Sequence, residues 1–324
     1  MRIIWVHTFN PKIKNSGVFM YEFLRAFELN EDVHIKLFFL GSLSNPVQLG
    51  KNLISLVKQR HEYDVIHCQY GSFCSLMCMF LPNKKIVTLR GSDLIRLTIG
   101  TWKERLHSRI AGFFTRFSLP KYDRIIVMSN QMKNMLPPKY AMKTSVVTDP
   151  IDLTKFTQQD RSSSRKKIFP AFDDNDVLIL FTSISRENPI KRFWLAESVV
   201  KKLNAINNGI KYKLVSANSF SNEDMKYVFS SADVCLLTSI YEGWPNCIKE
   251  SLACNTPFVS TDVSDLKDVA IRTKNCFVCK SDVDDLAEKI LCSLKMPAED
   301  LRKRIAFLSV DNIRDKLIKE YQSV

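Results

Sequence analysis

Two carboxylates eight positions apart carry the clearest chemical signal in this sequence. Glu242 and Glu250 lie on either side of a turn at Pro245. A carboxylate only accepts hydrogen bonds, so one acid could hold the paired hydroxyls of a sugar and the other those of a ribose. The same pattern also fits a capped surface helix whose two acids are solvated, and the residues alone leave both interpretations open.

The elements around these acids predict how they are positioned. The apolar run at 233–237 is typical of a short buried strand, and the apolar spacing after Pro245 predicts a helix with Ile248 and Leu252 on one side. The first turn of a helix carries unpaired backbone N–H groups and a partial positive charge, so it can hold a phosphate. Pro245 suits the first helical position, and Gly243 lets a ligand approach the backbone closely.

This stretch resembles the signature of a known family. The segment Tyr241–Glu250 resembles the E-x7-E motif of the retaining glycosyltransferases of family 4, which have the GT-B fold. Residues 253–262 resemble the strand that follows in that family, with Asn255 where the family usually has Gly. The resemblance implies an α/β fold of two Rossmann-like domains, whose parallel sheets face a central cleft that holds the active site.

The length of 324 residues predicts two domains of roughly 150 residues. The resemblance divides them into an acceptor-binding domain at 1–155 and a nucleotide-sugar-binding domain at 156–324, with a final helix that returns to the first domain. Strands that alternate with helical patterns predict parallel sheets, whose ligands collect at the carboxyl ends of the strands. The expected strands are 2–6, 33–40, 64–68, 86–89, 123–129, 177–182, 212–215, 234–237 and 277–279; the expected helices are 17–27, 53–60, 101–117, a segment from 286, and 313–321; the polar stretch 157–167 fits a linker.

Loops of the first half resemble family motifs in part. The loop at 7–18 carries one glycine, Gly17, where the family has a Gly pair near the donor phosphates and the acceptor. Residues 90–93 resemble the family's H-G-S-D, whose His lies beside the donor sugar. The His is Arg90 here, which cannot act as a base, so its expected role is to bind phosphate or sugar oxygens. Asp93 is interpreted as a helix N-cap.

Two more segments resemble the family at the domain crossing and in the second half. Residues 145–153 resemble its V-I-P-N-G-V-D-L, with Asp149 and Pro150 in place of Asn and Gly. The loop at 185–191 resembles G-R-x-x-x-x-K, in which Arg186 and Lys191 would clamp the donor diphosphate. Cations fixed there stabilise the negative charge that bond cleavage leaves on the nucleotide, at about 1.5–3 kcal/mol per charge-assisted hydrogen bond. A solvated basic loop is the alternative interpretation.

The net charge of +13 is unevenly distributed. Residues 1–150 hold 21 Lys and Arg against 10 Asp and Glu, a net charge of +11, whereas the remaining residues hold 26 against 24, or +2. The asymmetry indicates an anionic partner such as nucleic acid, an acidic membrane leaflet or a phosphorylated acceptor. A merely soluble basic surface fits the same counts.

A basic helix with bulky apolar side chains is predicted between residues 101 and 117. Its apolar stripe is Trp102, Leu106, Ile110, Phe113 and Phe117, and its cations are Lys103, Arg105, Arg109 and Arg116. Such a helix is suited to a membrane interface, where each cation near an anionic leaflet contributes about 1 kcal/mol. The alternative is an ordinary amphipathic helix that packs its stripe on its own sheet.

Other site classes have little support in the sequence. Nine cysteines lie mostly in apolar runs, as reduced thiols of a cytosolic protein do. Cys276 and Cys279 form a C-x2-C, but no second pair follows with zinc spacing, and the acids at 282, 284 and 285 are interpreted as helix caps. Neither the N-terminal apolar run nor residues 76–81 are long enough for a signal peptide or a membrane span.

The resulting hypothesis is a cytoplasmic retaining hexosyltransferase, peripheral on the inner face of the cytoplasmic membrane. It would move a sugar from a nucleotide sugar, a UDP-sugar, to a glycan or lipid-linked acceptor in polysaccharide or lipopolysaccharide synthesis, with no cofactor, no metal and no nucleic-acid partner. The resemblance assigns the ribose to Glu250, the diphosphate to Arg186 and Lys191, and the sugar and phosphates to Glu242 and the segment Gly243, Trp244, Pro245, Asn246, Cys247 and Ile248. The alternatives are a nucleotide-sugar epimerase of the same fold, a nucleic-acid-binding module and a non-catalytic family member.

Overall fold

The structure is a computed structural model that describes residues 1–10, 16–28, 30–183, 185–206, 209–217 and 220–324. Part of the loop expected at 7–18, residues 11–15, lies outside the described residues. The chain divides into two compact units: unit 1 comprises residues 1–150 and 310–324, and unit 2 comprises residues 151–309. The two units are described separately below.

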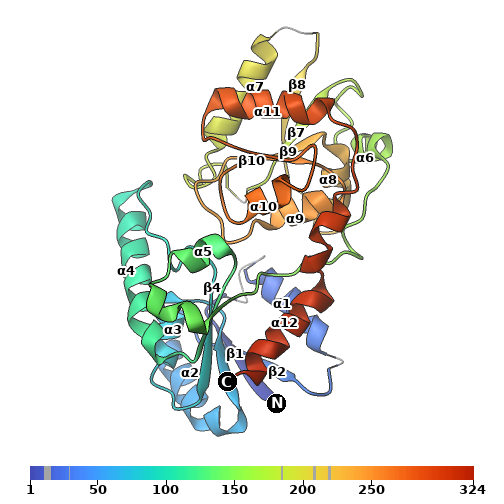
Figure 1. Cartoon of the computed structure of the whole chain (residues 1–324). Helices are drawn as coiled ribbons and strands as arrows, with labels where there is room; N and C mark the ends of the chain where they lie inside the picture. Colours follow the sequence, from blue (N-terminus) through green and yellow to red (C-terminus); the bar gives the residue numbers. More distant parts are fainter. Residues whose placement is uncertain (11–15, 29, 184, 207–208, 218–219) are drawn as a thin grey trace. The chain divides into compact units, whose positions relative to one another are not determined.

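Unit 1 is built on a six-stranded parallel sheet in the order β2-β1-β3-β4-β5-β6 (Figure 1). Its strands are β1 (Arg2–His7), β2 (His34–Phe39), β3 (Val65–Cys68), β4 (Lys84–Leu89), β5 (Arg124–Val127) and β6 (Thr144–Val146). The strands at the centre of the sheet are apolar throughout, and Val65–Cys68 is buried along its whole length. A strand covered on both faces needs such a continuous apolar run, which explains why these strands could be read from the sequence.

Helices cover the sheet of unit 1. They are α1 (Val18–Leu24), α2 (Pro46–Gln59), α3 (Ser72–Cys78), α4 (Trp102–Ser118), α5 (Asn130–Asn134) and α12 (Val310–Gln322). Helix α2 begins seven residues before the predicted start, because the Asn45 side chain caps it by accepting from the N–H of Gln48, and Pro46 takes the first helical position. Helix α12 buries Leu317 and Tyr321 in this unit, although it comes last in the sequence.

Unit 2 contains a five-stranded parallel sheet in the order β11-β10-β9-β7-β8. Its strands are β7 (Val177–Phe181), β8 (Tyr212–Ser216), β9 (Val234–Leu237), β10 (Phe258–Thr261) and β11 (Phe277–Cys279); its helices are α6 (Arg161–Ile168), α7 (Phe193–Ala205), α8 (Met225–Ser231), α9 (Asn246–Ala253), α10 (Leu266–Ala270) and α11 (Val283–Lys295). Helices α7 and α11 lie side by side over this sheet (Figure 1).

The strand order of unit 2 creates one distinctive position. The chain runs from β7 to β8 on one side and then returns to β9 on the other side of β7. At such a reversal the loops that leave the two neighbouring strands diverge, and ligands of parallel α/β sheets bind in the crevice between them. The loops after β7 and β9 are therefore the expected place for a ligand of unit 2.

The expected linker at 157–167 is wrong in its second half, which forms α6. Asp160 caps this helix by accepting from the N–H of Ser163 at 2.8 Å. Arg165 is buried at 3% exposure and donates to Asp233 at 2.5 Å. The polar composition that suggested a linker therefore reflects a capped helix fixed by a buried ion pair.

Candidate active site

The loops after β7 and β9 bring two of the predicted catalytic residues into contact. Lys191 Nζ lies 2.5 Å from Glu242 Oε1, and Ser239 Oγ donates to the same carboxylate oxygen at 2.6 Å. Burial disfavours the ammonium, but the charges of Glu242 and Cys247 outweigh burial and raise the pKa of Lys191. Lys191 is therefore a fixed cation at neutral pH.

The backbone around this ion pair is cross-linked. Thr238 Oγ1 donates to the carbonyl of Lys191 at 2.6 Å, and Arg192 Nε donates to the carbonyl of Thr238 at 2.6 Å. The N–H of Ile240 donates to the carbonyl of Ile190 at 2.9 Å. These bonds hold the two loops in register, so the contact between Lys191 and Glu242 is part of a rigid site.

Lys191 keeps hydrogen-bonding capacity that the described residues do not use. An ammonium has three N–H donors. The described part of the chain accounts for one of them, the bond to Glu242. Two donors thus remain for a ligand, which suits an anionic group held next to a carboxylate that binds hydroxyls.

Helix α9 begins next to this pair. Pro245 has an extended ψ of 116° and is the N-cap, so the helix starts at Asn246, one residue later than predicted. The backbone N–H groups of the first turn have no acceptor within the helix. The side chains of Trp244 and Ile248 are buried, at 8% and 0% exposure, so these two residues can face a ligand only through their backbone.

The two remaining predicted donor residues of unit 2 lie on the surface of this region. Arg186 is exposed, and its guanidinium lies 4.7 Å from the centre of the Phe193 ring. Glu250 lies on α9, half-exposed, eight residues after Glu242. Asn255, where the family has Gly, has φ of 59°, a left-handed conformation that Asn tolerates better than most residues.

Arg90, the predicted site residue of unit 1, is bound by its own unit. Its Nη1 donates to both carboxylate oxygens of Asp149, at 2.6 and 2.7 Å, and its Nε and Nη2 donate to the backbone and side-chain oxygens of Gln69. Its guanidinium also lies 4.0 Å from the centre of the Phe19 ring. Sequence reasoning missed the partner, although both residues replace neutral family residues and so form a complementary pair of changes.

Asp93 is not the N-cap that we predicted. It is buried at 0% exposure and accepts from the backbone N–H groups of Gly71, Arg90 and Gly91. Burial raises its pKa, while these backbone hydrogen bonds act in the opposite direction. Helix α4 is capped instead by Thr101, so Asp93 joins the ends of β3 and β4.

Gly17 has a conformational role that its neighbours require. It precedes α1 with φ of 74°, and a Cβ at this position would lie 2.9 Å from Phe9 Cβ. Both observations favour glycine for structural reasons. The prediction that Gly17 lies near donor phosphates stays a prediction.

A buried network in unit 1 was not predicted at all. Tyr321 Oη on α12 accepts from Trp5 Nε1 at 2.6 Å and lies 2.7 Å from His67 Nδ1. His67 Nε2 lies 2.7 Å from Thr88 Oγ1. Burial and the nearby Arg90 charge lower the pKa of His67 to about 3, so the imidazole is neutral. Only the apolar context of these polar residues in the sequence hinted at such a network.

Helix α4 exposes the apolar stripe that an ordinary amphipathic helix would bury. The exposed fractions are 63% for Trp102, 47% for Leu106, 45% for Ile110, 60% for Phe113 and 55% for Phe117. The helix packs through small residues instead, namely Ser108, Ala111, Gly112, Thr115 and Ser118. The alternative that the stripe packs on its own sheet is therefore wrong.

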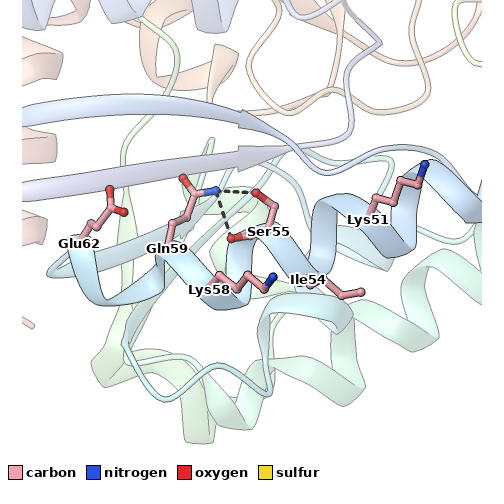
Figure 2. Close-up of a pocket in the computed structure, with 6 residues that line it drawn as sticks. All are labelled: Lys51, Ile54, Ser55, Lys58, Gln59 and Glu62. Atoms are coloured by element: carbon pink, nitrogen blue, oxygen red, sulfur yellow. Dashed lines mark hydrogen bonds between the residues drawn. The ribbon is translucent and has the colours of Figure 1, made fainter.

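Surface hollows and metal ligands add no second site. The hollow in Figure 2 is lined by residues of one helix and its end, among them Lys51 and Lys58, and another lies on α7. Within the described residues, no three His, Cys, Asp or Glu side chains gather as metal ligands would. Asp282 caps α11 by accepting from the N–H groups of Asp284 and Asp285, which confirms their predicted role. No described helix is both long and apolar enough to span a membrane.

Comparison with known proteins supports the interpretation of unit 2. Residues 184–296, which contain Lys191, Glu242 and α9, match the family model described as "Glycosyl transferases group 1". The match and the fold support a glycosyltransferase. No curated protein matches the chain.

Solved structures match the whole chain. Sucrose-phosphate synthase of Thermosynechococcus elongatus has a TM-score of 0.73 at 15% identity, over 100% of this chain and 99% of that one. HepE of Anabaena, in complex with UDP and glucose, has a TM-score of 0.69 at 15% identity over 100% of both chains. The chain has the GT-B fold. WaaB, a lipopolysaccharide outer core galactosyltransferase, has a TM-score of 0.66 at 13% identity over 100% of this chain and 99% of that one.

Proposed function

We propose that this protein is a retaining glycosyltransferase of family 4 that transfers a hexose from a nucleotide sugar to a glycan or lipid-linked acceptor. One observation carries the proposal: Lys191 keeps two hydrogen-bond donors beside Glu242 and the first turn of α9, in the segment that matches the family model. A cation, a helix N-terminus and a carboxylate supply what a sugar diphosphate needs. UDP is the favoured nucleotide, because HepE binds UDP and UDP-glucose in its solved complexes.

The residues of unit 2 divide the work by their chemistry. Lys191 and Arg186 stabilise the charge that develops on the leaving diphosphate, and the N–H groups of Asn246 and Cys247 hold its phosphates. Glu242 binds sugar hydroxyls, and Glu250 binds the ribose hydroxyls. No protein nucleophile is assigned, so a donor phosphate oxygen takes the acceptor proton on the face from which the nucleotide leaves. Two fixed cations at the diphosphate do the work that a metal does in other transferases.

A titration with nucleotides tests the donor site. We expect UDP and a UDP-sugar to raise the melting temperature, with a stabilisation of about 2.7 kcal/mol at a hundredfold excess over Kd. Product analysis then separates the reactions, because a transferase yields a glycosylated acceptor whereas an epimerase yields only an altered nucleotide sugar. Absence of any nucleotide effect on the folded protein would contradict the proposal.

We further propose that α4 rests on the anionic inner face of the cytoplasmic membrane, where a lipid-linked acceptor would be found. The exposed stripe is opposite the packed face of the helix, and Lys103, Arg105, Arg109 and Arg116 flank it. The net charge of +11 on residues 1–150 complements anionic lipid. Apolar side chains at the centre and cations at the edges are the arrangement of interfacial helices. The proposed pathway is polysaccharide or lipopolysaccharide assembly, since WaaB, of similar fold, acts on lipopolysaccharide.

Vesicle flotation tests the membrane contact with a matched control. Trp102 and Trp194 are exposed to nearly the same extent, 63% and 61%, but Trp194 lies on α7 of unit 2. We expect Trp102→Ser to weaken binding to vesicles that contain phosphatidylglycerol, and Trp194→Ser to leave it unchanged. Binding should fall with added salt and should be absent on neutral phosphatidylcholine vesicles. Equal losses in both variants would contradict the assignment to α4.

A further inference from the structure

We propose that Cys247 is the reactive thiol of this protein, a modification site for soft electrophiles such as α,β-unsaturated carbonyl compounds. Cys247 is the second residue of α9 and is half-buried. Its thiol lies within hydrogen-bonding reach of the Cys235 thiol on β9 and of the Thr182 side chain after β7. The thiol therefore lies between the two strands at which the order of the sheet reverses.

The surroundings of this thiol favour its ionised form. A hydrogen bond from Cys235 and the charge of Lys191 lower the pKa of Cys247, against the opposing effects of burial and Glu242. The pKa of Cys235 is raised, chiefly by the hydrogen bond with Cys247 and by burial, so Cys235 keeps its proton and donates it. The first turn of α9 adds a partial positive charge. A thiolate held in this way is the nucleophilic form of cysteine.

The other cysteines lack this combination of exposure and charge. Seven are buried: Cys68, Cys74, Cys78, Cys235, Cys254, Cys276 and Cys279. Cys292 is as accessible as Cys247 by class, but it lies in the interior of α11 rather than in the first turn of a helix. Cys292 is therefore the natural internal control for reactivity.

The reaction is a simple addition. The sulfur of Cys247 bonds to the β-carbon of the electrophile, the carbon–carbon double bond breaks, and the proton of the thiol ends on the α-carbon. The adduct then occupies the first turn of α9. Its consequence for the donor rests on the proposed function, because that function places the diphosphate at the same turn.

Labelling of the full chain with N-ethylmaleimide at pH 7, followed by peptide mass mapping, tests the proposal. We expect Cys247 to be labelled at least about tenfold faster than Cys292, because the thiolate fraction rises about tenfold for each pH unit by which the pKa falls. Two variants change the local charge in opposite directions. Lys191→Met should slow labelling of Cys247, whereas Glu242→Gln should accelerate it, and general loosening of the fold would accelerate both.

The outcomes separate this proposal from the proposed function. Equal or faster labelling of Cys292, or no slowing in Lys191→Met, would overturn the assignment of Cys247. Slower labelling of Cys247 in the presence of UDP supports both proposals. Rapid labelling of Cys247 that UDP does not slow leaves the reactive thiol established and counts against the donor site.

Discussion

The two ion pairs at the carboxyl ends of the sheets differ in what they leave free. Arg90 of unit 1 donates to Asp149 and Gln69 through three of its nitrogens and stacks on Phe19. Lys191 of unit 2 donates once, to Glu242, within the described residues. The exposed fractions of the four charged side chains are similar, between 12% and 24%.

The difference shows that burial and charge do not by themselves mark a binding cation. Both pairs are half-buried and both follow a strand that ends at the same type of edge. A guanidinium whose donors are satisfied stabilises its own loop, whereas an ammonium with two free donors can gain from a ligand. We therefore expect changes in unit 1 to affect stability and changes in unit 2 to affect ligand binding.

Acid should produce the largest effect, and only in unit 1. All five histidines lie at or before residue 107. Burial lowers the pKa of His67 to about 3, with the Arg90 charge adding to it, and burial lowers that of His7 to about 4 despite a hydrogen bond with the Phe9 backbone. Below pH 6.5 the unfolded chain binds protons that the folded unit does not, so stability falls by about 1.4 kcal/mol per pH unit for each histidine until the folded pKa is reached.

Hydrogen exchange at pH 7 and pH 5, corrected for intrinsic rates, measures this acid effect. Amides of β1 and β3 should lose protection while those of β7 and β9 keep it. His7→Leu removes one of the two groups without breaking a side-chain hydrogen bond of Nδ1, which has no partner among the described residues. The variant should show about half the pH dependence. Equal losses of protection in both units would contradict the comparison.

Arg90→Met should give the next largest effect, a loss of stability in unit 1 of about 3 kcal/mol. The change leaves the half-buried carboxylate of Asp149 without its guanidinium, and unpaired buried charges are costly. Protection of β4 amides in hydrogen exchange measures the loss. The double variant Arg90→Met/Asp149→Asn should recover part of it, because the uncompensated charge is gone. If instead nucleotide affinity falls more in Arg90→Met than in Lys191→Met, Arg90 is the binding cation that the family resemblance implied.

Lys191→Met should weaken UDP binding by about 2 kcal/mol, or roughly thirtyfold in Kd, since hydrogen bonds to charged groups contribute about 1.5–3 kcal/mol. Calorimetric titration with UDP measures the change. Unit 2 should remain folded, because Glu242 keeps the hydrogen bond from Ser239. An unchanged Kd in a folded Lys191→Met variant would remove the basis for the donor site.

The sequence allowed prediction of the parts of this site that depend on local pattern. The buried strand before Glu242, the helix after Pro245 and the GT-B fold were predicted, because apolar runs and helix starts are local signals. The contacts between side chains were not, since Lys191 and Glu242 lie 51 positions apart and meet only through the strand order of unit 2. The roles of the individual site residues remain predictions.

Two errors have a common physical cause. Asp93 was assigned to a helix cap, but it accepts from backbone groups of two separate loops. The stripe on α4 had the same spacing that a buried stripe would have, and only the small residues on the opposite face decide which side packs. In both cases the local pattern is compatible with two tertiary environments, so composition and spacing could not choose between them.

Tyr321→Phe should give the smallest effect, about 1–2 kcal/mol of stability, and it sharpens the comparison from within unit 1. The change removes the acceptor of Trp5 Nε1 and one partner of His67 Nδ1, while Gln69 Nε2 remains 3.2 Å from that nitrogen. Exchange protection of β1 amides should fall, and the Kd for UDP should stay within twofold. Because His67 lies in a network that continues through Gln69 to Arg90, a larger effect on UDP binding than on stability would mean that unit 1 takes part in holding the donor.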